Sequence, residues 1–538
     1  MVVRKIYLIC LLLFVQTFAN WNGDTIQPGR IDISGKNYYR ISSAEELAWF
    51  AKRVTSGDTA INGILVQDLV FGEENSVSSK IWEPIGNKDS LHYQGEFNGN
   101  GHSISGLFIQ YGENYIGLFK SIGTDGIVKN LSIKNARYVL KSVSGCSIGE
   151  CVYPRVGGIA AENEGLLDSV SFDGIIEASK NFETHLGGIV GFNLGTVSNA
   201  VNRAEINTVW SYIGGIAGTN GGTVIHCVNY GKMNSIGILP ISPLIYIGGI
   251  IGNNYGNALV SDNVNTADIY ASMESDENSG GYRNVFAYGG GVVGFQHAAN
   301  PLVRCSNYGK IQIYAGRRNV LSQYATSRSA SAYAGGIIGV SVMAAENISN
   351  YGPVVSVSSD GNSFAGGIAG LLNSALVKNA FSATDSVIAD SLAGAFIGKL
   401  LCHYNRSCGT SNTYYDKTLL PSLPFANVVV DSGTPAIDSL SLPTGKMQCD
   451  EFTLNLNTVN NTEMVSGIWE RCGEYPVLIG NCEIQRMTYS ETPTILHSVR
   501  GKNEKRKTWE NANERGRYKA DGKYINGRNA FGFYFLKR

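Results

Sequence analysis

The sequence predicts an all-β fold, a right-handed parallel β-helix (β-solenoid) with coils of about 28 residues and an N-terminal capping helix. Three observations lead to this prediction. A Gly-Gly-Ile-x-Gly pattern recurs along the chain, each repeat holds three short β-prone runs, and Gly and Asn separate those runs. Gly-Gly pairs flanked by Ile and Val disfavour the alternative, a repeat built of helices.

The N-terminus has the pattern of a signal peptide. Arg4 and Lys5 precede an apolar run from Ile6 to Val15, and the small residue Ala19 follows a short stretch. We expect a signal peptide over residues 1–19, cut after Ala19. The apolar run is shorter than the ~20 residues that span a membrane, so we expect no membrane span after cleavage.

Residues 20–115 are expected to form an N-terminal cap and the first coils. The stretch from Ser43 to Glu46 matches a capping box at the start of an amphipathic helix that runs to about Val54. A helix here would cover the open end of the solenoid, where strands otherwise lack a neighbour.

Residues 116–400 carry the repeats, and the motif copies begin 30, 27, 34, 42, 45, 31 and 28 residues apart. Stacked coils would rise ~4.8 Å each and share one core. Glycine would permit tight corners and close approach of the next coil. An eighth, worn copy runs from Gly394 to Gly398. The seven Gly-Gly pairs are Gly157 and Gly158, Gly187 and Gly188, Gly214 and Gly215, Gly248 and Gly249, Gly290 and Gly291, Gly335 and Gly336, and Gly366 and Gly367.

These copies resemble the GLUG motif of bacterial surface and secreted proteins. Other stretches match that family in its order, including Tyr39–Leu47, Trp82–Gly86, Gly95–Ile104, Tyr414–Lys417 and Tyr475–Leu478. The resemblance covers about residues 38–480. It implies a non-catalytic surface or secreted binding protein, similar to an adhesin.

The C-terminal part departs from the period. Residues 401–487 are expected to cap the other end of the solenoid, and residues 488–538 form a basic segment. From Leu496 to Arg538 there are 12 Lys and Arg against 4 Asp and Glu. The stretches 517–522 and 533–538 resemble a C-terminal sorting domain of the type IX secretion kind. That resemblance implies export from a Gram-negative bacterium, with the secretion machinery as a partner.

The sequence predicts no catalytic residue, no metal and no cofactor. It lacks His-Glu-x-x-His and a Gly-Lys-Ser/Thr phosphate loop, and Gly289-x-Gly291-x-x-Gly294 lies in a repeat without a βαβ context. The net charge of −1 argues against nucleic acid as a partner. An acidic cluster lies among Ser, Asn and Gly, which is more typical of a solvated loop than of paired catalytic groups. Its members are Asp262, Asp268, Glu274, Asp276 and Glu277.

Nine cysteines would remain after cleavage, so at least one thiol would stay unpaired within the chain. Cys227 and Cys305 hold the same register two units apart, about 10 Å, which is beyond disulfide reach, and we expect both to face inward. Cys449 could compete for a partner in the last of three candidate pairs. These pairs are Cys146 with Cys151, Cys402 with Cys408, and Cys472 with Cys482.

Three longer units each hold an insertion before a Gly-Gly pair, so the insertions should emerge from one corner of consecutive coils. Tyr and Arg side chains on one face suit sugars or acidic polymers. The alternative is variable surface loops without a ligand. The candidate ligand-binding residues, all in the third insertion, are Tyr314, Arg317, Arg318, Tyr324 and Arg328.

Two functions therefore remain open. The first is a secreted or cell-surface binding protein whose partner is a glycan, matrix or another surface protein. The second is a polysaccharide lyase or hydrolase on a β-helix. The second needs carboxylates, or a carboxylate with Arg or Lys, converging on one outer groove, whereas the sequence shows scattered charges.

Overall fold

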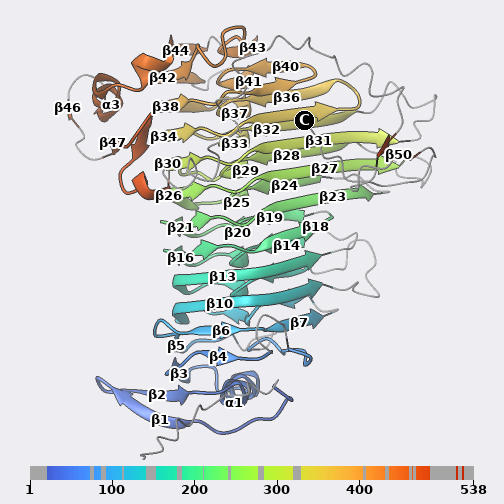
Figure 1. The fold of residues 1–538 in the computed structure, drawn as a ribbon, viewed down its shortest axis with the longest axis vertical. Coiled ribbons are helices and arrows are strands. Elements are labelled where there is room, and N and C mark those ends of the chain that lie inside the picture. Colours follow the sequence, from blue (N-terminus) through green and yellow to red (C-terminus); the bar gives the residue numbers. More distant parts are fainter. Residues whose placement is uncertain are drawn as a thin grey trace, which may run out of the picture. The chain divides into compact units, whose positions relative to one another are not determined.

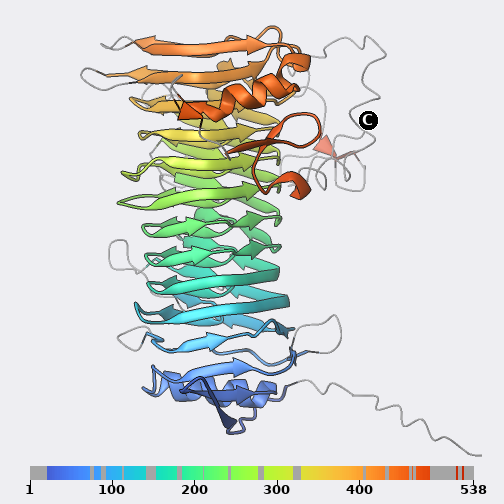
Figure 2. The same ribbon diagram turned by 90° about the vertical axis from the view of Figure 1, so that its left-hand side faces the viewer.

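The structure is a computed structural model, shown from two sides in Figures 1 and 2. It describes residues 21–72, 78–86, 92–111, 114–140, 153–178, 184–209, 211–239, 244–276, 284–318, 329–403, 408–430, 435–459, 463–464, 468–484, 517–518 and 524–525. The chain divides into two units, Met1–Gln485 and Arg486–Arg538. In the second unit, β49 (Arg517–Tyr518) and β50 (Tyr524–Ile525) pair antiparallel.

The first unit is a parallel β-helix, as the sequence predicts (Figure 1). Each coil adds strands to three sheets, A, B and C, and neighbouring coils pair in parallel. The pairing keeps the motif in register, with Gly187 opposite Gly214, Asn193 opposite Asn220, and Thr196 opposite Thr223. One sequence repeat is therefore one coil.

Sheets B and C lie on either side of the Gly-Gly corner. Sheet C comprises β8 (Tyr115–Ile116), β11 (Arg155–Gly157), β14 (Thr184–Gly187), β19 (Ser211–Gly214), β24 (Leu244–Gly248), β28 (Val285–Gly290), β32 (Ala330–Gly335), β36 (Asn362–Gly366) and β40 (Leu392–Gly394). Sheet B comprises β9 (Phe119–Ile122), β12 (Ala160–Asn163), β15 (Val190–Asn193), β20 (Ala217–Asn220), β25 (Ile251–Asn254), β29 (Val293–Gln296), β33 (Ile338–Ser341), β37 (Ala369–Asn373), β41 (Ile397–Cys402) and β43 (Ala426–Val430).

Sheet A forms the remaining wall, with up to three strands from one coil. It comprises β1 (Gly29–Ile33), β2 (Lys36–Ile41), β3 (Asn62–Leu65), β4 (Leu69–Val70), β5 (Glu96–Asn98), β6 (Ser103–Ser105), β7 (Phe108–Tyr111), β10 (Ile127–Leu140), β13 (Leu166–Ala178), β16 (Thr196–Ser198), β17 (Val201–Asn202), β18 (Glu205–Thr208), β21 (Thr223–Ile225), β22 (Val228–Asn229), β23 (Met233–Leu239), β26 (Leu259–Asn265), β27 (Ile269–Asp276), β30 (Leu302–Asn307), β31 (Ile311–Arg318), β34 (Ala345–Asn350), β35 (Val354–Ser358), β38 (Leu376–Ser382), β39 (Val387–Ala389), β42 (Gly409–Asp416) and β44 (Ala436–Leu442).

The N-terminal end carries the expected helix, α1 (Ala44–Thr55). Ser43 is its N-cap, and the Ser43 hydroxyl oxygen accepts a hydrogen bond from the Glu46 backbone N–H at 3.2 Å. Leu47, Phe50 and Val54 on one face of the helix are fully buried in the main core. The amphipathic pattern thus anchors α1 at the first coils (Figure 1).

The solenoid continues beyond the predicted boundary at residue 401, because β42 pairs with β38, β43 with β41, and β44 with β42, all in parallel. The final turn, residues 417–425, has no Gly-Gly pair. Its Leu420 and Phe425 pack against the end of the core instead. Since no further described coil stacks on this turn, the steric need for glycine is relieved there.

The residues after β44 pack against the flank of the solenoid, beside β34 and β38, rather than extending the stack (Figures 1 and 2). A second core cluster includes Phe381 and Tyr414 of the coils with Phe452 and Trp469. The Tyr475 hydroxyl also donates to a buried Asp416 carboxylate oxygen at 2.7 Å. The elements here are α2 (Thr444–Met447), α3 (Asp450–Asn457), β45 (Thr458–Val459), β46 (Glu463–Met464), β47 (Trp469–Arg471) and β48 (Pro476–Leu478).

The Gly-Gly corner between sheets C and B points inward. A Cβ atom on Gly215 would overlap both the Asn229 side chain in sheet A and the carbonyl oxygen of Gly249 in the next coil. The same clash with a sheet A asparagine would occur at Gly188, Gly249, Gly291 and Gly336. The second glycine of the motif is therefore required by contact across the interior.

Two ladders of buried amides run through the solenoid. At the ends of the sheet B strands, the Nδ2 atoms of Asn163, Asn193 and Asn220 donate to the amide oxygen one coil further on, at 2.7–2.8 Å. In sheet A each such bond measures 2.8 Å. The members of this second ladder are Asn202, Asn229, Asn265, Asn307 and Asn350. Each amide inside a ladder has a hydrogen-bond partner in the coil before it and in the coil after it, so its buried polar atoms are satisfied.

Several cysteine expectations can be placed in the structure. Cys227 and Cys305 are fully buried free thiols, separated by the coil that holds Asn263. Cys449 is also free. The structure joins Cys402 to Cys408 and Cys472 to Cys482, with Cα–Cα separations of 5.8 and 5.4 Å. Cys146 and Cys151 lie outside the described residues.

Candidate functional site

The three insertions leave the solenoid at one corner, between β23 and β24, β27 and β28, and β31 and β32. Tyr314 lies on β31, opposite Ser272, and is half-buried. Burial, together with the neighbouring Glu274 carboxylate, raises the pKa of Tyr314 to about 12. Tyr324 and Arg328 lie outside the described residues.

Arg317 and Arg318 lie at the end of β31 rather than in the insertion that follows it, and carboxylates of adjacent coils pair with both. Arg317 Nε donates to Asp360 Oδ2 at 2.8 Å, and the Arg317 side chain is only 5% exposed. Asp360 Oδ2 also accepts the Ala330 backbone N–H at 2.7 Å. Arg318 forms an ion pair with Glu274. Both arginines therefore pair with carboxylates of the same chain, although the Arg318 side chain stays 38% exposed. These partners lie in other coils, and the sequence does not identify them.

A line of aromatic residues, which we call the aromatic seam, follows the outer face of sheet C. Its residues stand two positions before six of the seven Gly-Gly pairs, and Arg155 holds this position before the first pair. Strand alternation directs the side chain outward there, while its neighbour, such as Ile213 or Ile247, is fully buried. Parallel pairing then places them in neighbouring coils at matching positions. The seam comprises His185, Tyr212, Tyr246, Tyr288, Tyr333 and Phe364.

Consecutive rings of the seam touch. Ring centroids lie 5.2 Å apart between Tyr212 and Tyr246, and again between Tyr246 and Tyr288, with planes inclined by 22° and 20°. Tyr288 meets Tyr333 edge to face at 5.2 Å, and Tyr333 stacks on Phe364 at 5.0 Å. Stacking occupies the ring faces, so the partly exposed tyrosines offer chiefly ring edges and polar hydroxyl groups to solvent.

The outer face of sheet B lies against the aromatic seam. Because the Gly-Gly corner points inward, the outer faces of sheets B and C approach each other on either side of it. A Cβ on Gly252 in sheet B would lie 2.5 Å from the Ile213 backbone nitrogen in sheet C, and one on Gly294 would lie 2.7 Å from that of Ile247. The third glycine of the motif thus permits this approach. Beyond it, Phe295 packs against Tyr246 with ring centroids 5.0 Å apart.

Charged groups lie near both ends of the seam, and a buried histidine lies at its start. His185 Nδ1 lies 2.6 Å from the Thr219 hydroxyl oxygen. Burial, together with the nearby Arg155 charge, lowers the pKa of His185 to about 3, so His185 is neutral near pH 7. Arg155 forms an ion pair with Glu162, and at the other end the Lys399 ammonium lies 4.8 Å from the Phe364 ring centroid.

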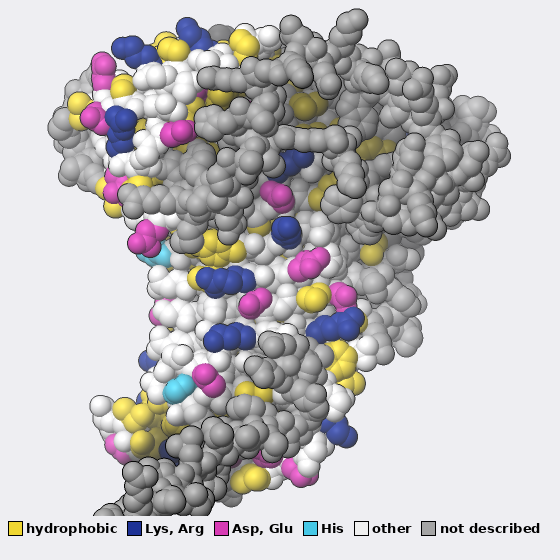
Figure 3. All heavy atoms as spheres, in the orientation of Figure 1, with side chains coloured by type: hydrophobic (Ala, Val, Ile, Leu, Met, Phe, Trp, Pro, Cys, Tyr) yellow, Lys and Arg dark blue, Asp and Glu magenta, His cyan; other side chains and the backbone are white. Residues whose placement is uncertain are grey.

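The outer face of sheet A has a different chemistry. Figure 3 shows Lys and Arg side chains alternating with Asp and Glu side chains over the middle of one face. Opposite charges of adjacent coils pair there, as in Arg137 with Glu177 at 2.9 Å and Arg304 with Asp262 at 2.6 Å.

Glu277 of the acidic cluster lies outside the described residues. Within the described part of the chain, no group of three or more His, Cys, Asp or Glu residues could hold a metal ion.

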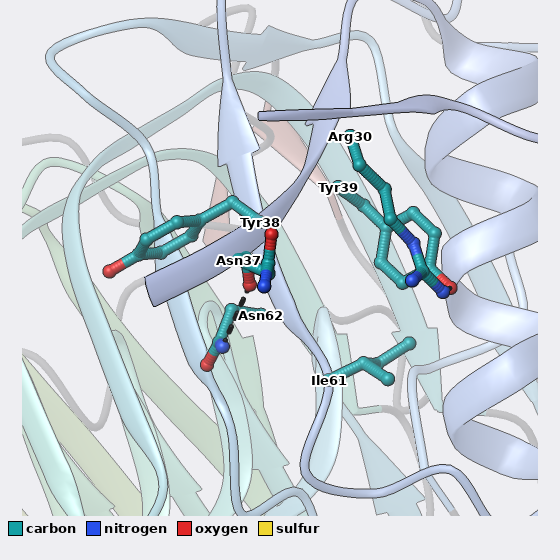
Figure 4. A pocket seen from close by; sticks show the side chains of 6 residues that line it. All are labelled: Arg30, Asn37, Tyr38, Tyr39, Ile61 and Asn62. Atoms are coloured by element: carbon teal, nitrogen blue, oxygen red, sulfur yellow. Dashed lines mark hydrogen bonds between the residues drawn. The ribbon is translucent and has the colours of Figure 1, made fainter. Parts of the chain in front are cut away.

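A small pocket of about 150 Å³ lies at the N-terminal end, between β1, β2 and the start of β3. Figure 4 shows that its lining side chains diverge: Tyr38 points to one side, while Arg30 and Tyr39 lie together on the other. Asn62 Nδ2 donates to the Asn37 carbonyl oxygen at 3.0 Å. Because the side chains do not converge on the pocket, it carries no functional assignment.

One motif was missed by sequence reasoning. Gly145-Cys-Ser147-Ile-Gly149 fits the Gly-x-Ser-x-Gly pattern, which in α/β-hydrolases exposes a nucleophile on a strand-to-helix turn. It lies outside the described residues, between β10 and β11. These flanking strands belong to a solenoid rather than to a strand–turn–helix unit, so the pattern lacks its usual context.

Comparisons with known proteins give partial matches, and no protein-family model matches the chain. A Gly-rich membrane protein of Evansella cellulosilytica is 34% identical over 110 residues, 20% of this chain and 12% of that protein. Halomucin of Haloquadratum walsbyi is 32% identical over 111 residues, 20% of this chain and 1% of halomucin. The matches thus span a small part of either relative.

A crystal structure of a Bacteroides ovatus protein described as a candidate immunoglobulin A1 protease is 12% identical to this chain, with a TM-score of 0.33. The match covers 82% of this chain and 92% of that one.

None of the helices in the described part of the chain is long and apolar enough to cross a membrane.

Proposed function

We propose that the chain is a secreted or cell-surface binding protein, similar to an adhesin, and that the aromatic seam is its recognition surface. The observation that carries this proposal is the run of six contacting rings in consecutive coils, from His185 to Phe364. The four tyrosines at its centre are partly exposed, whereas His185 and Phe364 at its ends are buried. Partly exposed tyrosines combine apolar contact area with a hydroxyl that can donate or accept a hydrogen bond. A rigid solenoid holds such groups in order without further folding on binding.

Sequence features support an extracellular location within this proposal. The N-terminal pattern is typical of a signal peptide, the motif copies resemble those of GLUG surface proteins, and the C-terminal stretch resembles a type IX sorting domain. The names of the partial relatives, a membrane protein and a halomucin, are compatible with it. The insertion corner adjoins the seam, since β24, β28 and β32 lead from one to the other.

The alternative is a polysaccharide lyase or hydrolase. Several carboxylates that could serve it are engaged by neighbouring residues: Glu274 by Arg318, Asp360 by Arg317, and Asp262 by Arg304. In these pairs the carboxylates link adjacent coils and do not converge on a common groove, as a pair of catalytic carboxylates would. Binding is therefore the better supported function.

A glycan array and a panel of matrix proteins, probed with the purified chain, test the proposal. We expect saturable binding and no shortening of a bound polysaccharide on prolonged incubation. Release of reducing ends or unsaturated products would favour the enzyme instead, and absence of binding to every glycan and matrix protein would refute a recognition role.

A further inference from the structure

We infer that the aromatic seam binds a single chain of an uncharged, extended polysaccharide that runs parallel to the solenoid axis, one sugar residue to each coil. This inference rests on the proposed function and names its ligand class. It is carried by three properties of the seam: its spacing, its charge, and the mixture of polar and apolar groups beside it.

The spacing favours a glycan over a peptide. Neighbouring seam rings lie 5.0–5.2 Å apart, one ring for each coil. An extended peptide advances ~3.3 Å per residue and places alternate side chains on opposite faces, so its side chains would fall out of step with the rings. One pyranose unit of an extended β-linked glycan advances by nearly the ring spacing. Each sugar could therefore repeat the contacts of the previous one.

The central seam favours an uncharged polymer. From Tyr212 to Tyr333 its rings are all tyrosine, and burial, with the adjacent tyrosines adding to it, raises the pKa of Tyr288. The facing positions of sheet B in these coils are Thr219, Asn253, Phe295 and Val340. An acidic polymer would leave its charges without cationic partners along this stretch. Such an arrangement is costly when the groups are partly desolvated.

The groups beside the rings suit the amphipathic surface of a sugar. Apolar contact would come from the ring edges of the tyrosines and Phe295. Hydrogen bonds would come from the tyrosine hydroxyls and the half-buried Asn253 and His297, whose side chains lie 3.0 Å apart. Hydroxyl groups can donate as well as accept, so they complement sugar hydroxyls in either direction of the polymer.

The test measures binding of a size series of cello-, manno- and xylo-oligosaccharides to the purified full chain by calorimetry. For at least one series we expect affinity to rise with each added sugar and to level off once the oligomer spans the four partly exposed tyrosines, from Tyr212 to Tyr333. Binding should change little between low and high salt, because no ion pairs form. Polygalacturonate and an extended Gly-Ser peptide are the acidic and peptide probes.

The double variant Tyr246→Phe with Tyr288→Phe tests whether the aromatic seam is the binding site, because it keeps both rings and removes two hydroxyls. We expect affinity to fall about tenfold or more, since each hydrogen bond contributes roughly 0.5–1.5 kcal/mol. The matched control is Tyr270→Phe on the outer face of sheet A, where Tyr270 is 37% exposed, and it should bind as the parent chain does.

The outcomes separate the two proposals. Oligosaccharide binding that is equal in parent, seam variant and control would overturn the seam assignment and leave the binding function standing. Tighter, salt-sensitive binding of polygalacturonate, or binding of the peptide alone, would overturn the ligand class. A chain that binds no glycan and no matrix protein at all would overturn the proposed function as well.

Discussion

Two lines of residues run along the same coils, and they differ in how tightly the fold constrains them. The inner line pairs the second glycine of each motif with a buried sheet A asparagine, and from Gly188 to Asn350 its chemistry is the same in five consecutive coils. The aromatic seam follows the outer surface through most of the same coils, but its residues are His, Tyr and Phe.

The difference has a steric cause. An inner glycine is confined by a backbone carbonyl oxygen of the next coil and by an asparagine side chain of sheet A, so only glycine fits. The sheet A residue must be an amide because each adjacent coil supplies one hydrogen-bond partner. A seam position contacts its neighbours through rings, and rings of different types can stack in slightly different ways. The inner line therefore sets the fold, whereas the seam leaves room for function.

The largest effect is expected for Gly215→Val at the inward corner. A side chain there would overlap the Gly249 carbonyl oxygen and the Asn229 amide, so the corner would have to move away from sheet A. We expect a loss of about 3 kcal/mol or more in the free energy of unfolding, measured by urea denaturation. The control is Gly29→Val in β1, where an added Cβ meets no atom within 4 Å. Equal stability of the two variants would contradict the tight packing of Gly215 against the interior of the solenoid.

A smaller effect is expected in the asparagine ladders, and it should depend on position. Asn265 accepts from Asn229 and donates to Asn307, both at 2.8 Å, and it also bonds the backbone N–H and carbonyl oxygen of Ala267. Asn265→Ala therefore removes the ladder bonds on both sides together with the bonds to Ala267. Asn163 begins its ladder, and its Oδ1 atom is buried without a hydrogen-bond partner. We expect losses of about 2–3 kcal/mol for Asn265→Ala and about 1 kcal/mol for Asn163→Ala in urea denaturation. A similar loss for both variants would show that the number of ladder bonds lost does not determine the loss of stability.

A third effect concerns the N-terminal cap and depends on pH. Burial alone would raise the pKa of Glu96, but hydrogen bonds from Lys36 and Lys129, at 2.7 and 2.9 Å, bring it down to about 2. A carboxylate with a lowered pKa stabilises the fold above its ordinary pKa, and this contribution is lost as the pH falls toward 2. Because Lys36 is half-exposed, we discount the gain to about 1–2 kcal/mol.

The variant Glu96→Gln isolates this contribution. It should be less stable than the parent at neutral pH, and the difference should shrink between about pH 4.5 and pH 2, when unfolding is followed at each pH. An unchanged difference at acid pH would mean that Glu96 acts through packing rather than through charge.

The contrast between the two lines also explains what the sequence could reveal. Gly-Gly pairs and the β-prone runs between them repeat visibly, so the β-helix, the coil as repeat unit and the helix after Ser43 were all predictable. The seam was visible too, as Tyr-Ile-Gly-Gly at 212–215 and again at 246–249. The sequence did not show that these tyrosines line an outer face beside sheet B, because the close approach of sheets B and C at the third glycine of the motif is a property of the folded coils. The carboxylate partners of Arg317 and Arg318 lie a coil away, and spacing alone does not identify them.

The smallest effect on stability is expected for Tyr288→Phe in the seam. The ring, which contacts Tyr246 and Tyr333, is retained, so the stacking that supports the coil remains. Since only an outward-facing hydroxyl is lost, the free energy of unfolding should change by no more than about 0.5 kcal/mol, well below the loss for Asn265→Ala. A loss of about 1 kcal/mol or more in the urea experiment would mean that the hydroxyl serves the fold. The seam would then be a second structural line, and the recognition surface would have to be sought at the insertion corner.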